Sequence, residues 1–357
     1  MSRFARVVHV YYFEEPVLDN EWSGLHVARP SDDNIIVLTP HLRKGLTQDE
    51  SNNVVNRLLH QFLVSSGIEE YIAWYYTPMA LLYTQGISPT VTVYDCMDEL
   101  SHFRFAPLNL PSLEKSLLEM ADVVFTGGHS LYKAKCDKHS HVFAFPSSID
   151  KEHFSKARVQ TADPVDQRDI PKPRLGFYGV LDERFDFQLV EQMASMRPEW
   201  HIVLIGPIVK VDVASVPRAT NIHYLGMKDY AMLPMYLANW DIAIMPFAIN
   251  DSTRYISPTK TPEFLAAGKP VVSTAITDVV NDYGKQHLVS ICDTAEEFVQ
   301  ECEQILKSGS SKEWMTIVDS HLADNSWDIT WAKMKAIITG ALEEKKVPLL
   351  KVVGPSI

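Results

Sequence analysis

Residues 246–273 constrain the fold most, because they join a strand, a polar loop, a helix and a second strand in one short run. The apolar stretch Ile242–Met245 predicts the first strand, and Val271–Ser273 predicts the second. Pro258 is expected to open the helix and Gly268 to end it. The intervening loop carries the polar residues Asp251, Arg254 and Ser257. A helix that begins on the carboxyl side of a parallel strand directs free N–H groups outward, so this segment predicts an anion site.

Short apolar runs alternate with helical patterns along both halves of the chain. This alternation is typical of βαβ units and a mostly parallel sheet. Residues 53–66 place apolar side chains at helical spacing, which predicts a helix with one face in a core. The predicted strands are 7–13, 35–38, 71–75, 91–94, 123–125 and 142–145 in the first half, and 175–178, 201–205, 222–224, 242–245 and 271–273 in the second. The sequence therefore predicts an α/β protein with two Rossmann-like domains.

The length of 357 residues allows two cores of about 150 residues each. A polar, proline-containing stretch at 155–172 predicts a linker, which limits the first domain to 1–154 and the second to 155–325. Ser326 is expected to cap a final helix within 326–357, and the last residues, from 343 on, are expected to form a loose tail.

Composition excludes several classes of protein. The formal net charge of -12 argues against nucleic acid as a partner, although a local basic pocket for one diphosphate is compatible with it. The four cysteines show no metal-binding or redox spacing, and the N-terminus does not resemble a signal peptide, so we expect a cytoplasmic protein. No apolar run reaches the roughly 20 residues of a membrane span, so any membrane contact is expected to be peripheral.

Glu263 and the run FLAAGKPVV that follows it resemble the donor-binding segment of nucleotide-sugar-dependent glycosyltransferases with the GT-B fold, in the large glycosyltransferase group 1 (family 4-like). That segment carries two Glu residues, and Glu263 matches the second. Tyr255 stands where the first is expected, and Asp251 is the nearest acidic residue upstream, which makes it a catalytic candidate. The hinge of the family is matched by Pro146, Asp150 and Phe154.

The resemblance implies two Rossmann-like domains, with a C-terminal helix that crosses back onto the first domain. It also implies a donor site in the second domain. Glu263 would hold the ribose of the donor, and the diphosphate would lie near basic and hydroxyl side chains. The implied donor-binding residues are Gly179, Arg184, Met227, Lys228, Arg254, Ser257, Thr259, Lys260 and Glu263.

Three acidic residues follow a predicted strand of the first domain. A carboxylate in a partly apolar cleft can act as a general base because burial raises its pKa. Asp98 is the main candidate, with Asp95 as a second. The alternative is structural: Asp95 would cap the following helix, and Glu99 would be solvated. A metal site at these residues is the weaker interpretation, because no third ligand is evident.

The glycines Gly127 and Gly128 follow another predicted strand and precede a helix. This turn could bind an acceptor phosphate or carboxylate with His129 as donor, or it could be a tight turn that needs glycine. GT-B first domains usually begin with a strand, a glycine-containing loop and a helix. Residues 1–6 lead directly into the first predicted strand here, so that unit is expected to be missing.

The resemblance implies transfer of a sugar from a nucleoside diphosphate sugar to a hydroxyl of a glycan or lipid-linked acceptor. Synthesis of a cell-surface polysaccharide or glycolipid is the expected setting. Neither a metal nor another cofactor is expected. Two alternatives stay open: a nucleotide-sugar epimerase of the same fold, and an inactive subunit that binds a glycan or nucleotide. The sugar, the base, the acceptor and the stereochemistry are not determined by the sequence.

Overall fold

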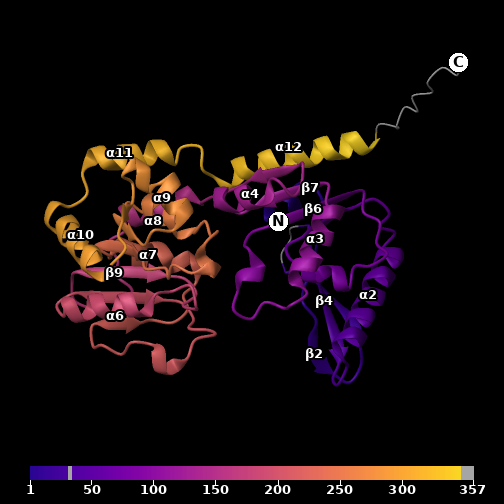
Figure 1. The fold of residues 1–357 in the computed structure, drawn as a ribbon, viewed down its shortest axis with the longest axis horizontal. Coiled ribbons are helices and arrows are strands. Elements are labelled where there is room, and N and C mark those ends of the chain that lie inside the picture. The colour runs from indigo at the N-terminus through magenta and orange to yellow at the C-terminus, as the bar shows by residue number, and fades with distance from the viewer. Residues whose placement is uncertain (31–33, 347–357) are drawn as a thin grey trace, which may run out of the picture.

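The computed structural model describes residues 1–30 and 34–346, which form two lobes side by side (Figure 1). The N-terminal lobe holds two sheets and the C-terminal lobe holds one. Each lobe contains one fully parallel sheet, which confirms the predicted α/β class. No described helix has the length and apolar character needed to cross a membrane.

One N-terminal sheet is mixed and the other is parallel. The first has the order β1-β4-β2, with β3 antiparallel to β4; its strands are β1 Val10–Phe13, β2 Val17–Asn20, β3 Gly24–Ala28 and β4 Ile35–Arg43. The second has the order β5-β6-β7-β8, with strands Ile72–Tyr75, Val91–Cys96, Val123–Thr126 and Val142–Ala144. The accompanying helices are α1 Ser2–Ala5, α2 Gln48–Ser65, α3 Leu110–Met120 and α4 His129–Lys135.

The first lobe departs from the sequence-based prediction at its start. The strand predicted at 7–13 begins only at Val10, because α1 and a turn precede it. Strands β2 and β3 were not predicted, since Val17 and Leu18 of β2 are exposed and the residues of β3 are exposed or half-buried, without a buried apolar run. Their partner β4 alternates buried and half-buried residues along its length, which gave the stronger signal.

The C-terminal lobe is built on a parallel sheet of the order β11-β10-β9-β12-β13-β14. Its strands are β9 Arg174–Tyr178, β10 His201–Ile205, β11 Ile222–Tyr224, β12 Ile242–Met245, β13 Val271–Ser273 and β14 Ser290–Ile291. Its helices are α5 Lys151–Ser155, α6 Phe187–Met196, α7 Leu233–Ala238, α8 Lys260–Ala266, α9 Thr277–Asp282, α10 Ala295–Ser308 and α11 Lys312–His321. Four strands, β10 to β13, have the predicted limits. The two-residue strand β14 was too short to predict.

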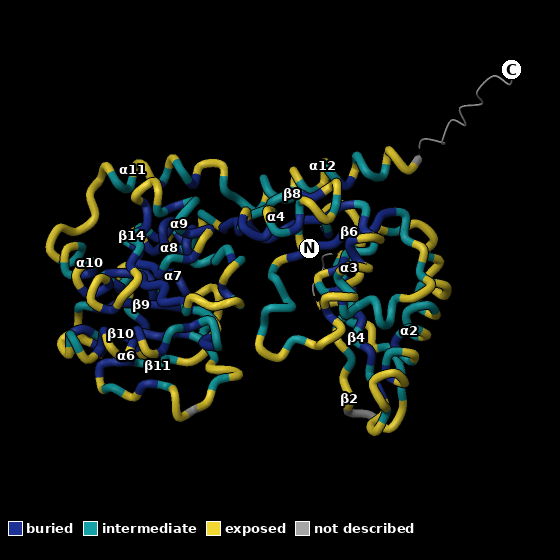
Figure 2. Tube along the Cα trace, in the orientation of Figure 1, coloured by how far each residue is buried: buried dark blue, intermediate teal, exposed yellow. Residues whose placement is uncertain are grey.

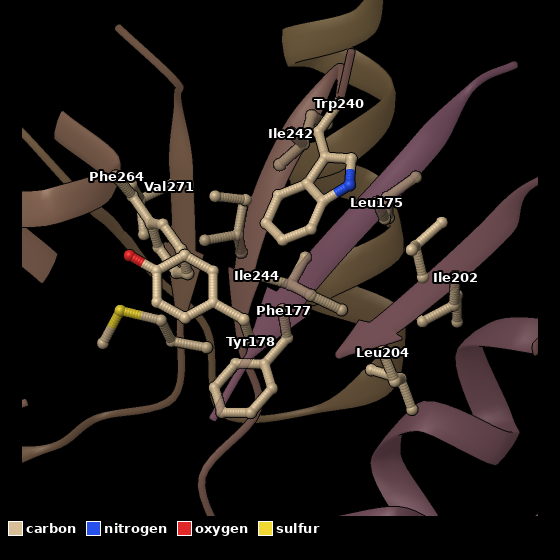
Figure 3. Packing of buried hydrophobic residues seen from close by; sticks show 14 of the residues in the cluster. Leu175, Phe177, Tyr178, Ile202, Leu204, Trp240, Ile242, Ile244, Phe264 and Val271 are labelled. Atoms are coloured by element: carbon tan, nitrogen blue, oxygen red, sulfur yellow. The ribbon is translucent and has the colours of Figure 1, made fainter. Parts of the chain in front are cut away.

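The core of this lobe lies around the central strands (Figure 2, Figure 3). Every residue of β9 and β12 is buried, which is why both read as continuous apolar runs rather than alternating ones. Trp240 covers β9 at Gly176, where an added Cβ atom would lie 2.0 Å from the indole. The ring of Tyr178 packs edge-on against Phe264 at a centroid distance of 5.0 Å. The core therefore holds the end of β9 close to the first turns of α8.

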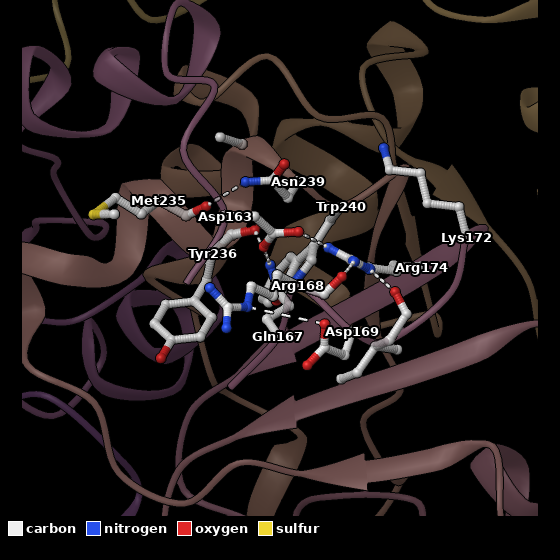
Figure 4. A network of polar contacts seen from close by, with 12 residues as sticks. Asp163, Gln167, Arg168, Asp169, Lys172, Arg174, Met235, Tyr236, Asn239 and Trp240 are labelled. Carbon is white, nitrogen blue, oxygen red and sulfur yellow. Dashed lines mark hydrogen bonds and ion pairs between the residues drawn. The ribbon is translucent and has the colours of Figure 1, made fainter. Parts of the chain in front are cut away.

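The polar stretch 155–172, predicted as a linker, packs against the C-terminal lobe (Figure 4). Arg174 is 3% exposed; its guanidinium forms an ion pair with Asp163 at 2.5 Å and donates to the carbonyl of Ile170 at 2.7 Å. Gln167 is buried and accepts a hydrogen bond from the Trp240 indole at 2.8 Å. A composition rich in polar residues and proline therefore does not imply a loose connection here.

Helix α12, Trp327–Lys346, crosses from the C-terminal lobe back onto the N-terminal lobe, as predicted (Figure 1). Ser326 caps its start through a hydrogen bond from the Ile329 amide at 3.2 Å. Ile338 is buried against the strands β6 and β7. Lys345, within the stretch predicted as a tail, still belongs to the helix and pairs with Asp122 at 2.7 Å. Residues 347–357 lie outside the described part of the chain.

Candidate active site

Helix α8 carries the two residues on which the sequence-based prediction most depends. It begins at Lys260, two residues after Pro258, and it follows the loop that leaves β12. Glu263 accepts a hydrogen bond from the Tyr178 hydroxyl at 2.5 Å. Burial raises the pKa of Glu263, against the effects of the Tyr178 hydroxyl and the Lys260 ammonium. A half-buried carboxylate with its second oxygen free of that bond is suited to accept hydroxyl groups of a ribose.

Lys260 faces the turn that ends β9. At Gly179 the backbone has φ +151, and an added Cβ atom would lie 3.1 Å from Lys260 Cε. Burial lowers the pKa of Lys260, while the carboxylate of Glu263 opposes that shift. The Lys260 ammonium lies 3.4 Å from the Thr259 hydroxyl. A close glycine turn and a partly desolvated ammonium are a suitable setting for a phosphate group.

Arg184 lies in the same region but already has a carboxylate partner. Its guanidinium donates to both oxygens of Asp182, at 3.0 and 2.8 Å. Burial acts to lower the pKa of Arg184, and the bonds to Asp182 outweigh it and raise that pKa. A diphosphate bound by Arg184 would therefore either share the guanidinium with Asp182 or displace the Asp182 carboxylate from it.

Asp98, from the N-terminal lobe, lies near the Lys260 and Arg184 side chains just described. Burial raises the pKa of Asp98, and the positive charges of Arg184 and Lys260 oppose the rise. The lobes meet beside it: the Arg184 guanidinium stacks over the Phe103 ring at 5.5 Å, and the Arg104 amide donates to Glu183 at 3.1 Å. The predicted base and the predicted phosphate-binding residues therefore come from different lobes into one site.

Asp95 and Glu99, the other two of the three acidic residues at 95–99, are held by structural contacts. Asp95 is 5% exposed and accepts a hydrogen bond from the Trp74 indole at 3.1 Å; burial raises its pKa to about 6. It does not cap the following helical turn, which begins after Glu99. Glu99 was expected to be solvated, but it forms an ion pair with the buried Lys135 at 2.6 Å. A catalytic role for Asp95 stays a prediction.

The remaining predicted donor residues are spread around this cluster. Lys228 pairs with Asp166 at 2.7 Å, and its neighbour Met227 is 75% exposed. Ser257 accepts a hydrogen bond from the Ser147 hydroxyl through its carbonyl at 3.0 Å, which ties the loop to the hinge. The cluster of Asp98, Gly179, Arg184, Lys260 and Glu263 is what the structure brings together.

Asp251 and Arg254 lie on the segment before α8, where their contacts are with His102 and Tyr255 and not with that cluster. Asp251 is exposed, and its carbonyl lies 3.2 Å from the His102 ring nitrogen. Arg254 is exposed and stacks over Tyr255 at 5.4 Å. Asp251 lines a cavity of about 450 Å³ whose lining comes from the C-terminal lobe. Arg254 lines that cavity and also one of about 660 Å³ at the junction of the lobes. Their roles as catalytic and donor-binding residues stay predictions.

The glycine turn before α4 already contacts a carboxylate from the protein itself. The Ser130 amide donates to Asp278 at 2.9 Å, and Asp278 comes from α9 of the other lobe. An added Cβ atom at Gly128 would lie 2.2 Å from the Asp278 carboxylate. The turn needs glycine for close packing and not for a positive φ, since Gly128 has φ -174, and binding of an acceptor anion here stays a prediction.

Sequence analysis missed Asp182, Tyr178 and Asp278. Asp182 and Tyr178 flank the Gly179 turn, and a basic residue two positions after an acidic one was the available signal for the Asp182–Arg184 pair. Asp278 lies 148 positions from Ser130, so no local pattern connects them. Among the described residues, no group of three or more His, Cys, Asp or Glu side chains is arranged to hold a metal ion.

Comparison with known sequences finds a family match within the C-terminal lobe. Residues 172–308 match the family described as "Glycosyl transferases group 1". The chain is 28% identical over 267 residues to the Bacillus subtilis (strain 168) protein named "Putative teichuronic acid biosynthesis glycosyltransferase TuaH". That match covers 68% of this chain and 65% of the relative's length.

Comparison with solved structures extends over nearly the whole chain. The sucrose-phosphate synthase of Thermosynechococcus elongatus aligns with a TM-score of 0.68 and 14% identity, over 96% of this chain and 91% of that one. A UDP-forming α,α-trehalose-phosphate synthase of Burkholderia vietnamiensis gives a TM-score of 0.69 and 14% identity, over 94% and 91%. Likenesses at this identity show the fold. The chain therefore has the GT-B fold, and residues 172–308 of its C-terminal lobe match the group 1 glycosyltransferases.

Proposed function

We propose that this protein transfers a sugar from a nucleoside diphosphate sugar to a hydroxyl of a glycan or lipid-linked acceptor. The observation that carries the proposal is that Lys260, which shares helix α8 with Glu263, interacts electrostatically with Glu263 and with Asp98 of the other lobe. A site for a sugar donor needs a cation beside the diphosphate and a hydrogen-bond acceptor for the ribose hydroxyls. Transfer also needs a group that takes the proton from the hydroxyl of the acceptor molecule.

The roles follow from the contacts. Glu263, oriented by the Tyr178 hydroxyl, would hold the ribose. Lys260 would neutralise the diphosphate as it leaves, which is the main electrostatic task of such a transfer. Asp98 would orient the acceptor hydroxyl and accept its proton. The contacts between Arg184 and Phe103 hold the lobes together beside this site, which would exclude water from the reaction.

Similarity to a protein named for teichuronic acid biosynthesis supports synthesis of a cell-surface polysaccharide as the setting. Under that proposal the enzyme works in the cytoplasm, with peripheral contact at the inner face of the membrane where a growing glycan or lipid-linked acceptor is found. A hexose is the proposed sugar. These finer assignments rest on resemblance and on the expected chemistry of the acceptor.

Calorimetric titration of the purified chain with UDP, GDP, ADP and dTDP tests the proposal. We expect selective binding of one nucleotide, and we expect Glu263→Ala to weaken it because the ribose loses its carboxylate partner. Absence of binding by all four nucleotides would contradict a donor site. Conversion of the donor sugar without any acceptor would instead indicate an epimerase, and binding without turnover would indicate an inactive subunit.

Lys260→Ala tests the assignment of the diphosphate. The variant should bind the selected nucleoside diphosphate more weakly by about 1.5 to 3 kcal/mol, the range for a hydrogen bond to a charged group. Affinity for the corresponding nucleoside, which lacks phosphates, should be unchanged. Lys269→Ala is not a suitable control, because Lys269 donates to the carbonyls of Ala238 and Trp240. Lys307→Ala, at an exposed lysine of the same lobe, provides one. An unchanged diphosphate affinity in folded Lys260→Ala would remove this residue from the site.

A further inference from the structure

The larger cavity at the junction of the lobes shares only Arg254 with the residues predicted to bind the donor. Its volume is about 660 Å³, within the usual range for sites that bind small molecules. One wall comes from α4 of the N-terminal lobe and the other from α9 and from the loop before α8. The wall residues used below are His129, Ser130, Lys133, Arg254, Asn281 and Asp282.

The cavity presents cations from both lobes. Lys133 and Arg254 are exposed, and neither forms an ion pair with any residue in the described ranges. His129 is a third nitrogen donor on the α4 wall. Since unpaired Lys and Arg side chains on opposite walls of one cavity can bind the same anion, this arrangement favours a ligand with a negatively charged group.

Two carboxylates face these cations, and both have other interactions. Asp278 is 2% exposed and bound to the Ser130 amide, so its charge is compensated by α4 rather than by Lys133. Asp282 is half-buried on the α9 wall; burial raises its pKa, and the fields of His129 and Lys133 oppose that rise. Beside Asp282 lies the Asn281 amide. A carboxyl group and an amide side by side are suited to hydrogen-bond neutral hydroxyl groups.

One buried donor on the α4 wall has no partner. Ser130 is 8% exposed, and its hydroxyl makes no hydrogen bond with a described residue. Ser130 lines the cavity together with Tyr255, whose ring supplies an apolar surface. An unpaired buried hydroxyl costs free energy unless a ligand or water satisfies it. The cavity thus combines cations, hydroxyl-binding groups and an aromatic ring.

The glycine turn that leads into the wall of the cavity packs against the backbone next to the proposed catalytic carboxylate. Gly127 packs against the Met97 carbonyl, where an added Cβ atom would lie 2.5 Å away, and Met97 precedes Asp98. Gly128 packs against Ser257 in the same way, at 2.8 Å. The residues that follow, His129 and Ser130, line the cavity. A long acceptor whose reacting hydroxyl reaches Asp98 could therefore place another of its residues here.

We propose that this cavity binds an acidic sugar residue of the acceptor, with Lys133 and Arg254 on its carboxylate or phosphate group and Asn281 and Asp282 on its hydroxyls. The inference rests on the proposed transferase function, and it narrows the acceptor to an anionic glycan. A uronic acid and a sugar phosphate share the required chemistry, so the test includes both.

The test measures binding of small probes to the full chain by ligand-observed NMR. The probes are methyl glucuronide, its neutral counterpart methyl glucoside, glucose 6-phosphate and inorganic phosphate. We expect the glucuronide or the sugar phosphate to bind at least about tenfold more tightly than the glucoside, the range for a charged hydrogen bond. Equal binding of the neutral and acidic sugars would overturn the proposal. Inorganic phosphate that binds as tightly as the best sugar would overturn the assignment of a sugar.

Variants locate the binding. Lys133→Gln and Arg254→Gln should each weaken binding of the acidic sugar about three- to tenfold, because each removes one partly exposed charge. Lys138→Gln, at an exposed lysine just beyond α4, should leave it unchanged. Unchanged binding in both cavity variants would place the sugar elsewhere and overturn the proposal. Titration of Lys133→Gln with UDP separates the proposed sugar site from the proposed donor site. If the variant binds the nucleotide normally while the sugar test fails, the proposal of a donor site is unaffected.

Discussion

Asp98→Asn should lower the rate of sugar transfer by about 10²- to 10⁴-fold, the contribution of a general base in comparable reactions. Asparagine keeps the shape of the side chain but cannot accept the proton of the acceptor hydroxyl. The carboxylate lies in the field of Lys260 and Arg184, so nucleotide affinity should change little by comparison. Single-turnover transfer with saturating donor measures the chemical step, and titration with the nucleoside diphosphate measures binding separately.

The pH dependence gives a second readout. Burial raises the pKa of Asp98, and the base must be unprotonated, so kcat/KM should fall as the pH is lowered through this raised pKa. That acidic limb should disappear in Asp98→Asn. Glu119→Gln, at an exposed carboxylate of the same lobe, is the matched control. Full transfer by folded Asp98→Asn would assign the acidic cluster to structure, and loss of transfer in Asp251→Asn instead would move the base to Asp251.

Lys135→Met should destabilise the N-terminal lobe by about 3 to 5 kcal/mol, the usual cost of removing one partner from a buried ionic group. The Lys135 side chain is 0% exposed, and its ammonium lies 2.6 Å from Glu99 and 2.7 Å from Glu114. Burial acts to lower the pKa of Lys135, but the bonds to Glu114 and Glu99 outweigh it, so the group is charged in the folded protein. Removal of the ammonium leaves two buried carboxylates without a cation.

Urea unfolding followed by tryptophan fluorescence measures this change, and Lys138→Met, at an exposed position, should shift the midpoint little. The triple variant Lys135→Met, Glu99→Gln, Glu114→Gln should recover most of the lost stability, because it replaces the ionic group by neutral side chains. A loss below about 1 kcal/mol in Lys135→Met would show that water or local movement compensates the two carboxylates. Since Glu99 follows Asp98, we also expect slower transfer in this variant.

The fold was largely predictable from periodicity. The central strands β9 and β12 are buried on both faces, so their sequences are continuous apolar runs with sharp ends, and their limits were predicted within one residue. Strands β2 and β3 lie at the surface and depend on pairing with β4, so their own sequences carry little signal. The packing of 155–172 was missed because it depends on one buried arginine, Arg174, which no local pattern marks as buried.

The site was predictable where one segment holds its parts. Lys260 and Glu263 lie on a single helix behind a single strand, so their spacing in the sequence already placed them together. Lys228 was assigned to the donor by its position in a turn, and that role stays a prediction; what the sequence did not indicate is the ion pair of its side chain with Asp166. Ion pairing depends on which carboxylate lies nearest in space, and Asp166 is 62 positions away in the chain (228 − 166).

The sequence by itself determined the α/β class, the strand–helix unit of the second lobe that carries Lys260 and Glu263, and the helix that Ser326 begins, because each depends on local periodicity and on capping chemistry. Only the tertiary structure decided which partners Asp95, Asp98 and Glu99 have. Trp74 and Lys135 reach the first and third of these from distant segments, while Arg184 and Lys260 face Asp98 across the junction of the lobes. Burial and partners set the chemistry of a carboxylate, and both are properties of the folded chain.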